Sequence, residues 1–425
     1  MDALRHRAVW SDVRRERLML AALCAALILR LLFALVYWTD KPLTHDEHEY
    51  LALGESVAEG RGFQYSESYE AALGGIRFGR APLYPAFIAA IRVFSAGPNV
   101  VRNVRIAQAA VGTLVVWLIS VLARRIAGSK AGLAAAWIAA AYPPLVWISA
   151  YVLSETLYSA AALASIALLA PLIDGRPTPV GWGSRAVRMG LAAGGVAGLA
   201  VLIRPAMLFF LVALGIWLVL RRRLVLLAAV AAGALVVVSP WTVRNYREYH
   251  RWILVASEGG ITFWTGNHPL SIGEGDMAAN PAIKRESQRI RAEHPGWTEE
   301  ELEPVFYGQA FRAIRRDPIW WAGLLARKLF YTVVPVGPSY TLHSRLYFGA
   351  TLVSYGILLP FGFAGLIFAG RSNARPRALL LLAVSAVLVC LVFLPQERFR
   401  IPVIDPALIV GAGCLIGRHR LVRSH

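Results

Sequence analysis

Long apolar runs separated by short polar stretches fill most of this 425-residue chain. Most runs have about 20 residues, enough for a helix to cross a hydrocarbon core of roughly 30 Å. Only helices or closed barrels satisfy the backbone in lipid, and these runs are too long and alternate too little for barrel strands. The pattern predicts an all-α integral membrane protein with about ten transmembrane helices, over residues 18–38, 103–123, 131–148, 152–173, 187–203, 206–220, 224–240, 346–369, 378–394 and 401–416.

Two further apolar stretches, 82–96 and 318–336, are short or interrupted by charge. Arg92 lies in the first, and Arg327 and Lys328 lie in the second. Such segments commonly lie along the membrane surface as juxtamembrane helices, where basic side chains meet lipid headgroups. We expect that placement for both stretches. If both crossed instead, the number of transmembrane helices would rise to about twelve.

The composition agrees with a membrane protein and narrows the partners. Hydrophobic residues make up 57% of the chain and the mean hydropathy is +0.53, whereas soluble domains are roughly 45–50% apolar. A net charge of +18 could suggest nucleic acid, but the arginines lie in short clusters between apolar runs, as the positive-inside rule requires. The expected partner is the lipid bilayer, with no nucleic acid. Cys24, Cys390 and Cys414 lie in apolar runs and imply no disulfide framework.

The charge distribution also predicts a topology. With a cytoplasmic N-terminus and neither surface stretch crossing, the large basic clusters fall on the cytoplasmic side. Eight of the 26 acidic residues lie in 39–80 and eleven in 241–318, so polar chemistry gathers on the outer, periplasmic or extracellular, face of a plasma (inner) membrane. The expected segments are a cytoplasmic N-terminus (1–17), an N-terminal transmembrane core (18–240) that includes a catalytic outer loop (39–102), a second outer loop with an interfacial helix (241–345), C-terminal transmembrane helices (346–416) and a cytoplasmic tail (417–425).

Candidate chemistry begins directly after the first span, where Asp46 and Glu47 are adjacent and residues 47–59 have helical spacing. A sugar transferase needs a carboxylate as general base, to take the proton from a hydroxyl that attacks the anomeric carbon. The alternatives are solvated loop acids or a metal site that includes His45 and His48. Neighbouring residues rarely converge on one ion, so we predict no metal ligands, while a divalent metal as cofactor stays open.

Short motifs follow along the chain in the predicted outer loops or near the outer ends of spans. They are Gly60-Arg61-Gly62-Phe63, Arg80-Ala81-Pro82-Leu83-Tyr84-Pro85, Ser154-Glu155-Thr156-Leu157-Tyr158, Leu202-Ile203-Arg204-Pro205, Pro240-Trp241-Thr242-Val243-Arg244-Asn245-Tyr246, Thr265-Gly266-Asn267-His268-Pro269 and Glu397-Arg398-Phe399-Arg400-Ile401-Pro402. Together with the acidic pair, this order resembles the GT-C glycosyltransferases over nearly the whole chain. The nearest branch is that of dolichyl-phosphate-mannose protein mannosyltransferases, bacterial aminoarabinose transferases and rhizobial galacturonosyltransferases. No acceptor-sequon motif of the oligosaccharyltransferase type is visible.

The resemblance implies a GT-C fold and a membrane enzyme, a hexosyl- or pentosyltransferase. It would transfer a sugar, with inversion, from a polyprenyl-phosphate donor to a hydroxyl of a glycan, glycolipid or protein acceptor. Asp46 would be the general base, with Glu47 and Glu155 supporting acceptor binding or site electrostatics. The implied substrate-binding residues are Tyr50, Arg80, Tyr84, Asn267 and His268. Because guanidinium groups bind phosphate bidentately, the donor phosphate is expected at Arg204, Arg244, Arg398 and Arg400.

Simpler interpretations stand beside these roles. Glu155 lies near bilayer depth, where an acid is costly unless it is paired or functional, so a salt bridge to an arginine is the alternative. Arg398 and Arg400 could snorkel towards the membrane surface, and His268 could face solvent in a turn. For the whole protein, the alternative function is a lipid or glycolipid transporter or flippase that uses the same charges as a headgroup path.

Overall fold

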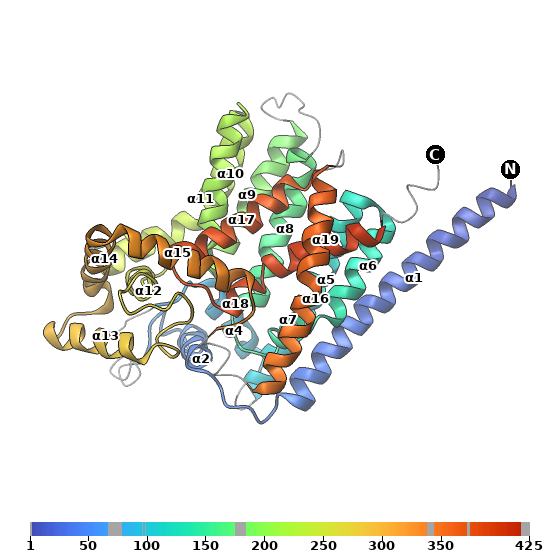
Figure 1. Ribbon diagram of the computed structural model, residues 1–425. Helices are drawn as coiled ribbons and strands as arrows, with labels where there is room; N and C mark the ends of the chain where they lie inside the picture. Colours follow the sequence, from blue (N-terminus) through green and yellow to red (C-terminus); the bar gives the residue numbers. More distant parts are fainter. Residues whose placement is uncertain are drawn as a thin grey trace.

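The computed structural model describes residues 2–66, 79–95, 97, 99–174, 184–337, 344–371 and 375–417, and all regular elements within these ranges are helical (Figure 1). The predicted cytoplasmic tail lies almost wholly outside them. Six helices are long and apolar enough to cross a membrane: α1 (Asp2–Leu32, continued by the π-helix η1, Phe33–Tyr37), α5 (Asn99–Ala127), α8 (Glu155–Ile173), α9 (Arg185–Ile203), α11 (Leu224–Tyr249) and α16 (Arg345–Gly370). The protein is therefore an all-α, multi-pass membrane protein.

Shorter helices complete the bundle and its loops. Those in predicted spans are α6 (Ser129–Ala141), α7 (Pro143–Trp147), α10 (Met207–Leu220), α17 (Arg377–Val392) and α19 (Ile404–Gly417). Those in predicted loops and at helix junctions are α2 (His45–Ala58), α4 (Leu83–Val93), α12 (Gly259–Gly266), α13 (Pro281–Glu293), α14 (Glu299–Arg316), α15 (Pro318–Val333) and α18 (Glu397–Arg400). At 1.5 Å per residue α4 is about 16 Å long, too short to cross the bilayer core.

The span predicted over 131–148 is not one helix. It divides at Tyr142, where α6 ends and Pro143 begins α7. Proline has no N–H for the helical ladder, but it is tolerated in the first turn of a helix, which explains the break. The adjoining span predicted from residue 152 begins as a helix only at Glu155. These two breaks bring irregular backbone close to the charged residues described below.

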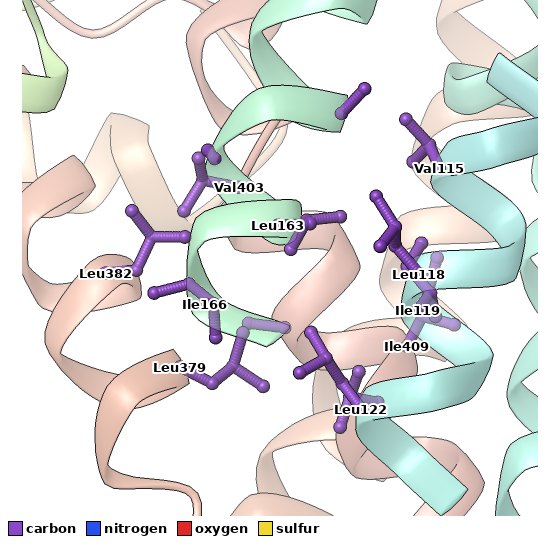
Figure 2. Packing of buried hydrophobic residues seen from close by; sticks show 14 of the residues in the cluster. Val115, Leu118, Ile119, Leu122, Leu163, Ile166, Leu379, Leu382, Val403 and Ile409 are labelled. Carbon is purple, nitrogen blue, oxygen red and sulfur yellow. The ribbon is translucent and has the colours of Figure 1, made fainter. Parts of the chain in front are cut away.

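Apolar side chains from distant parts of the chain form the core of the bundle. Figure 2 shows Leu118 of α5, Leu163 of α8, Leu382 of α17 and Ile409 of α19 meeting at its centre. Small residues allow other helices to approach closely, as is usual in lipid. A Cβ at Gly194 of α9 would lie 2.1 Å from the carbonyl oxygen of Val230 in α11, so these two helices meet backbone to backbone.

The helices of the two predicted outer loops lie together. Figure 1 shows α12, α13 and α14 gathered at one side of the bundle, with α2 and α4 below its centre. Within this part of the molecule α2 packs on α4, and α12 packs on α14. We call it the loop end. Its helices are amphipathic or short, and α2 carries Asp46 and Glu47.

Candidate active site

Asp46 is held in place by the first turn of α2. Thr44 is the N-cap of that helix, and its hydroxyl accepts from the backbone N–H of Glu47 at 3.4 Å. The Glu47 carboxylate accepts in return from the Thr44 N–H at 2.7 Å, which completes a capping box. This cap moves the helix start two residues before the predicted 47. Asp46 therefore sits in a defined first turn with only 19% of its side chain exposed.

Two arginines bind the Asp46 carboxylate, one at each oxygen. Arg80 donates from Nη2 to Oδ1 at 2.7 Å, and Arg398 donates from Nη1 to Oδ2. Arg80 comes from the segment before α4, and Arg398 comes from α18, more than 300 residues away from Asp46. Bidentate or doubly paired carboxylates of this kind have a fixed geometry. The site is thus assembled from three separate parts of the chain.

Arg80 also binds two carboxylates that the sequence did not single out. Its Nε donates to Oε2 of Glu49 at 2.7 Å and lies 3.3 Å from Oε1 of Glu258. Its guanidinium carbon lies 5.2 Å from the centre of the Tyr50 ring, within the range of a cation–π contact. Glu49 could have been found from its position three residues after Asp46, on the same helical face. No local pattern points to Glu258, because it meets Arg80 only through the tertiary fold.

A second ion pair adjoins the first. Arg204, at the C-terminus of α9, lies 2.6 Å from Oε1 of Glu155 at the start of α8. Arg398 reaches the same carboxylate, with its Nε 4.0 Å from Oε1. The hydroxyl of Tyr50 donates to Ser154 Oγ at 3.2 Å, which ties α2 to this pair. The salt bridge considered as the alternative for Glu155 is therefore present.

We define the Asp46 cluster by the charged groups that these contacts join. It contains three arginines and four acids: Arg80, Arg204, Arg398, Asp46, Glu49, Glu155 and Glu258. Burial alone would raise the pKa of the Asp46 carboxyl, but attraction to Arg398 and Arg80 is stronger and holds that pKa well below its usual range. Asp46 is therefore ionised and fully paired in the ligand-free protein.

Glu258 behaves in the opposite way. Removal of its carboxylate from water raises the pKa of Glu258 to about 7. Attraction to Arg80 opposes this shift, while the negative charges of Glu49 and Asp46 add to it. About a third of its side chain, 35%, stays exposed. The cluster therefore gains a negative charge beside Arg80 as the pH rises through the neutral range.

Several predicted site residues have other surroundings. Both oxygens of Glu47 bind backbone N–H groups, those of Thr44 and, at 2.8 Å, Val152, so Glu47 joins the α2 cap to the break before α8. Tyr84 is fully buried behind Tyr50, with its hydroxyl bonded to Gln108. These contacts support the backbone around Asp46, and they leave neither Glu47 nor Tyr84 open to a substrate.

Two further predicted substrate residues lie in α12 and the turn after it. Asn267 is 1% exposed, and its amide is engaged by Lys328, Trp321 and two backbone carbonyls. His268 is half-buried against Trp264, and its Nδ1 accepts from the Leu270 N–H at 3.1 Å. Within the described part of the chain, the polar contacts of Asn267 and His268 lead to α15, α17 and the turn itself, and not to the Asp46 cluster.

Two of the four predicted phosphate-binding arginines lie away from the Asp46 cluster. Arg400 is 3% exposed and pairs with Asp405 at 2.8 Å inside the helical bundle. Arg244 packs against the rings of Trp241 and Tyr249 and donates to the carbonyl of Phe63 at 3.4 Å. Burial within the bundle and an aromatic cradle, respectively, account for these two placements. Of these four arginines, Arg398 binds Asp46 and Arg204 binds the neighbouring Glu155 of the cluster.

A metal site does not form from the acidic pair and its histidines. Within the described ranges, no three His, Cys, Asp or Glu side chains are grouped as ligands. His45 is exposed with its Nε2 3.6 Å from Glu49, while Glu47 turns into the protein. Successive residues of one helix point in different directions, so the four neighbouring candidates do not converge.

Comparison with solved structures identifies the architecture. No family model and no curated protein matches the sequence. The archaeal oligosaccharyltransferase AglB from Archaeoglobus fulgidus, in complex with an inhibitory peptide and a dolichol-phosphate, superposes with a TM-score of 0.54 at 16% identity, over 95% of this chain and 50% of that one. The chain has the GT-C fold. ArnT from Cupriavidus metallidurans, bound to undecaprenyl phosphate, is also similar, with a TM-score of 0.41 at 15% identity, over 97% of this chain and 78% of ArnT.

This GT-C chain spans about half the length of AglB. The match covers nearly all of the present chain, so its helical bundle and the loop end both belong to the shared architecture. At such low identity the likeness establishes the fold, while activity and substrates depend on the site itself.

Proposed function

We propose that this GT-C protein is a glycosyltransferase that moves a sugar from a polyprenyl-phosphate donor to an acceptor hydroxyl, with Asp46 as general base. The observation that carries the proposal is the Asp46 cluster, in which one carboxylate lies between Arg80, just before α4, and Arg398 of α18. A base and phosphate-binding cations are the two elements that such a transfer needs. The solved complex of AglB with a dolichol-phosphate supports a lipid-phosphate ligand for this fold.

A groove beside the cluster suits the lipid part of the donor. It has a volume of about 510 Å³ and is lined by apolar side chains of α4, α5, α8 and α9, among them Leu83, Leu157 and Ile203. Ile203 directly precedes Arg204, and Leu157 lies two residues after Glu155. A prenyl chain lying in this groove would place its phosphate near Arg204 and Arg398. Lateral entry from the membrane follows from that arrangement.

The reaction is a single displacement. Asp46 takes the proton of the acceptor hydroxyl as the acceptor oxygen forms a bond to the anomeric carbon of the sugar. The bond from that carbon to the donor phosphate breaks, and its electron pair leaves with the polyprenyl phosphate. The leaving phosphate is a weak base that needs no protonation, and its charge is stabilised by Arg204 and Arg398. Attack opposite to the leaving group inverts the anomeric configuration.

The two arginine contacts also bear on the strength of Asp46 as a base. With a guanidinium on each oxygen, Asp46 is a poor base. A donor phosphate that binds Arg398 removes part of this attraction and frees Oδ2 next to the sugar. Base strength would then rise only when the donor is present. We place this chemistry on the periplasmic or extracellular face of the plasma membrane, where the predicted topology puts the loop end.

The experiment is a transfer assay with purified protein in lipid nanodiscs. Polyprenyl-phosphate donors carrying mannose, 4-amino-arabinose or galacturonate are supplied with glycan, glycolipid and peptide acceptors, and mass spectrometry detects the released polyprenyl phosphate and the new linkage. The wild-type protein should use at least one donor. Asp46→Asn should lower kcat by roughly 10²–10⁴-fold, the usual contribution of a general base.

Glu59→Gln is the matched control, because Glu59 is an exposed acid at the other end of α2, paired with Arg61. It should leave transfer unchanged. Normal turnover by a folded Asp46→Asn protein would refute the base assignment. The protein is also reconstituted into liposomes of the same lipid composition. Movement of a lipid or glycolipid across the liposome membrane without a new linkage would instead identify a transporter.

A further inference from the structure

Lys328 of α15 is fully buried, with 0% of its surface exposed. Its Nζ donates to Oδ1 of Asn267 at 3.1 Å and to the carbonyl oxygens of Leu391 at 2.9 Å and Phe393 at 2.7 Å. Three acceptors match the three N–H bonds of an ammonium group. Burial lowers the pKa of Lys328 to about 7, and the three hydrogen bonds offset part of the cost of burying this polar group. The expectation that Lys328 meets lipid headgroups is therefore wrong, because the side chain turns into the protein.

The carbonyl acceptors belong to the C-terminal end of α17. The last carbonyls of a helix lack partners within it and carry partial negative charge, so a buried cation is favourable there. Asn267 completes the arrangement, since its Nδ2 donates to the carbonyl of Val392 at 2.9 Å. Lys328 and Asn267 thus bind three consecutive carbonyls, those of residues 391–393. We call this arrangement the carbonyl clamp.

The clamp is built from three helices in close contact. The indole Nε1 of Trp321, about two turns before Lys328 in α15, donates to Asn267 Oδ1 at 3.0 Å. Gly266, at the end of α12, lies against the clamped backbone, and a Cβ there would come within 1.8 Å of the Phe393 carbonyl oxygen. Only glycine permits this approach. The second loop segment is therefore fitted to the end of α17.

Only four residues separate the clamp from Arg398. The backbone between them has a further contact at Pro395, whose carbonyl accepts from the Gly275 N–H at 3.2 Å. The side chain of Gln396 accepts from Nε of Arg398 at 2.9 Å. We propose that the carbonyl clamp positions Arg398 against Asp46, so that Lys328 and Asn267 are positioning residues for the donor-phosphate site. The identity of the ligand rests on the proposed function, while the coupling of the clamp to Arg398 does not.

The coupling is tested without any ligand by hydrogen exchange. Lys328→Met keeps an unbranched side chain, slightly shorter than that of lysine, and removes all three donors. The amides of residues 394–401 should then exchange about tenfold faster, the effect of losing roughly 1.4 kcal/mol of local stability. Arg327→Gln is the matched control, because Arg327 is the neighbouring residue and is exposed. Asn267→Ala provides a second variant if Lys328→Met fails to fold. Unchanged exchange in 394–401 in the folded variant would overturn the proposal.

A double-mutant cycle tests the role in ligand binding, with undecaprenyl phosphate as the probe. Lys328→Met and Arg398→Gln should each weaken binding about tenfold, the size of one lost charge-assisted hydrogen bond. The double variant should bind no more weakly than Arg398→Gln alone, because the clamp acts through Arg398. Additive losses would show that Lys328 acts by another route. If the wild-type protein does not bind undecaprenyl phosphate, the proposed donor fails, and hydrogen exchange alone decides on the clamp.

Discussion

The short helix α18 supplies arginines to two ion pairs with different properties. Arg398 binds Asp46 at the loop end, where 29% and 19% of the two side chains are exposed. Arg400, two residues later, binds Asp405 inside the bundle, where the exposed fractions are 3% and 0%. Both pairs join an arginine of α18 to an aspartate. The surroundings, and not the residue types, separate them.

The buried pair has further contacts inside the bundle. Asp405 also accepts from the Tyr142 hydroxyl at 2.9 Å, and the Arg400 guanidinium lies 3.4 Å from the centre of the Tyr355 ring. The Asp46 pair shares its partners with other charges and stays open to solvent, so a ligand can compete for the arginine. A closed pair holds helices together, whereas an open cluster with more acids than arginines can rearrange when an anion binds.

The largest expected effect is a loss of folding stability when the buried pair of Arg400 and Asp405 is broken. Asp405→Asn leaves the Arg400 charge buried without a counter-ion, which costs about 3–5 kcal/mol for a broken buried ion pair. The midpoint of thermal unfolding in detergent should fall clearly, while the folded fraction keeps its kcat. Asp46→Asn should do the reverse, with little change in unfolding. If Asp405→Asn unfolds like the wild type, the assignment of this pair to stability is incorrect.

A smaller effect separates the two arginines in ligand binding. Arg398→Gln should raise the Kd for undecaprenyl phosphate about tenfold, because one charge-assisted hydrogen bond is worth roughly 1.5–3 kcal/mol. Arg400→Gln should leave the Kd of the folded protein unchanged, since the guanidinium lies inside the bundle. Equilibrium binding in nanodiscs measures both. Equal losses in the two variants would mean that Arg400 also reaches the ligand.

The smallest effect concerns pH and Glu258. As the pH rises through about 7, this carboxyl ionises beside Arg80, and the added negative charge should raise the KM for the anionic donor by roughly a few-fold. Its pKa is higher in the folded chain than the ordinary 4.5, so the folded state binds the proton more tightly and stability falls as the pH rises from 4.5 to about 7.

Glu258→Gln should remove both changes. The KM for the donor and the unfolding midpoint are measured between pH 5 and 9 (roughly two units on either side of neutrality). Glu59→Gln, an exposed acid with its own arginine partner, serves as control. A pH profile that is identical in wild type and Glu258→Gln would assign the change near pH 7 to another group.

The helical membrane class and the placement of Asp46 followed from local patterns. Lipid demands long apolar helices, so hydropathy predicted the helical class, and six of the described helices are long and apolar enough to cross a membrane. The region after the first span was correctly predicted as a helix, although Thr44 starts it earlier than expected. The division at Tyr142 was missed, because a proline inside an apolar run reads as an interrupted span and not as a new helix.

The sequence could not predict which charged residues pair with each other, for a different reason. Asp46 and Arg398 are more than 300 residues apart, and no periodicity relates them. Arg398 and Arg400 have nearly the same sequence surroundings, yet the turn of α18 directs them to opposite partners. Buried Lys328 looked like a surface residue, because two of its three acceptors are backbone carbonyls 63 and 65 residues later in the chain.

The sequence by itself determined that this chain is a helical membrane protein. It also determined that the acidic residues concentrate in two loops and that a carboxylate follows the first span. Those properties depend on transfer of side chains into lipid and on local helix caps, which short segments encode. Only the tertiary structure decided which arginines reach Asp46, which stay in the bundle and what holds Arg398 in place. Ion pairs and backbone carbonyl contacts form between distant segments, so their energy appears only when the helices have packed.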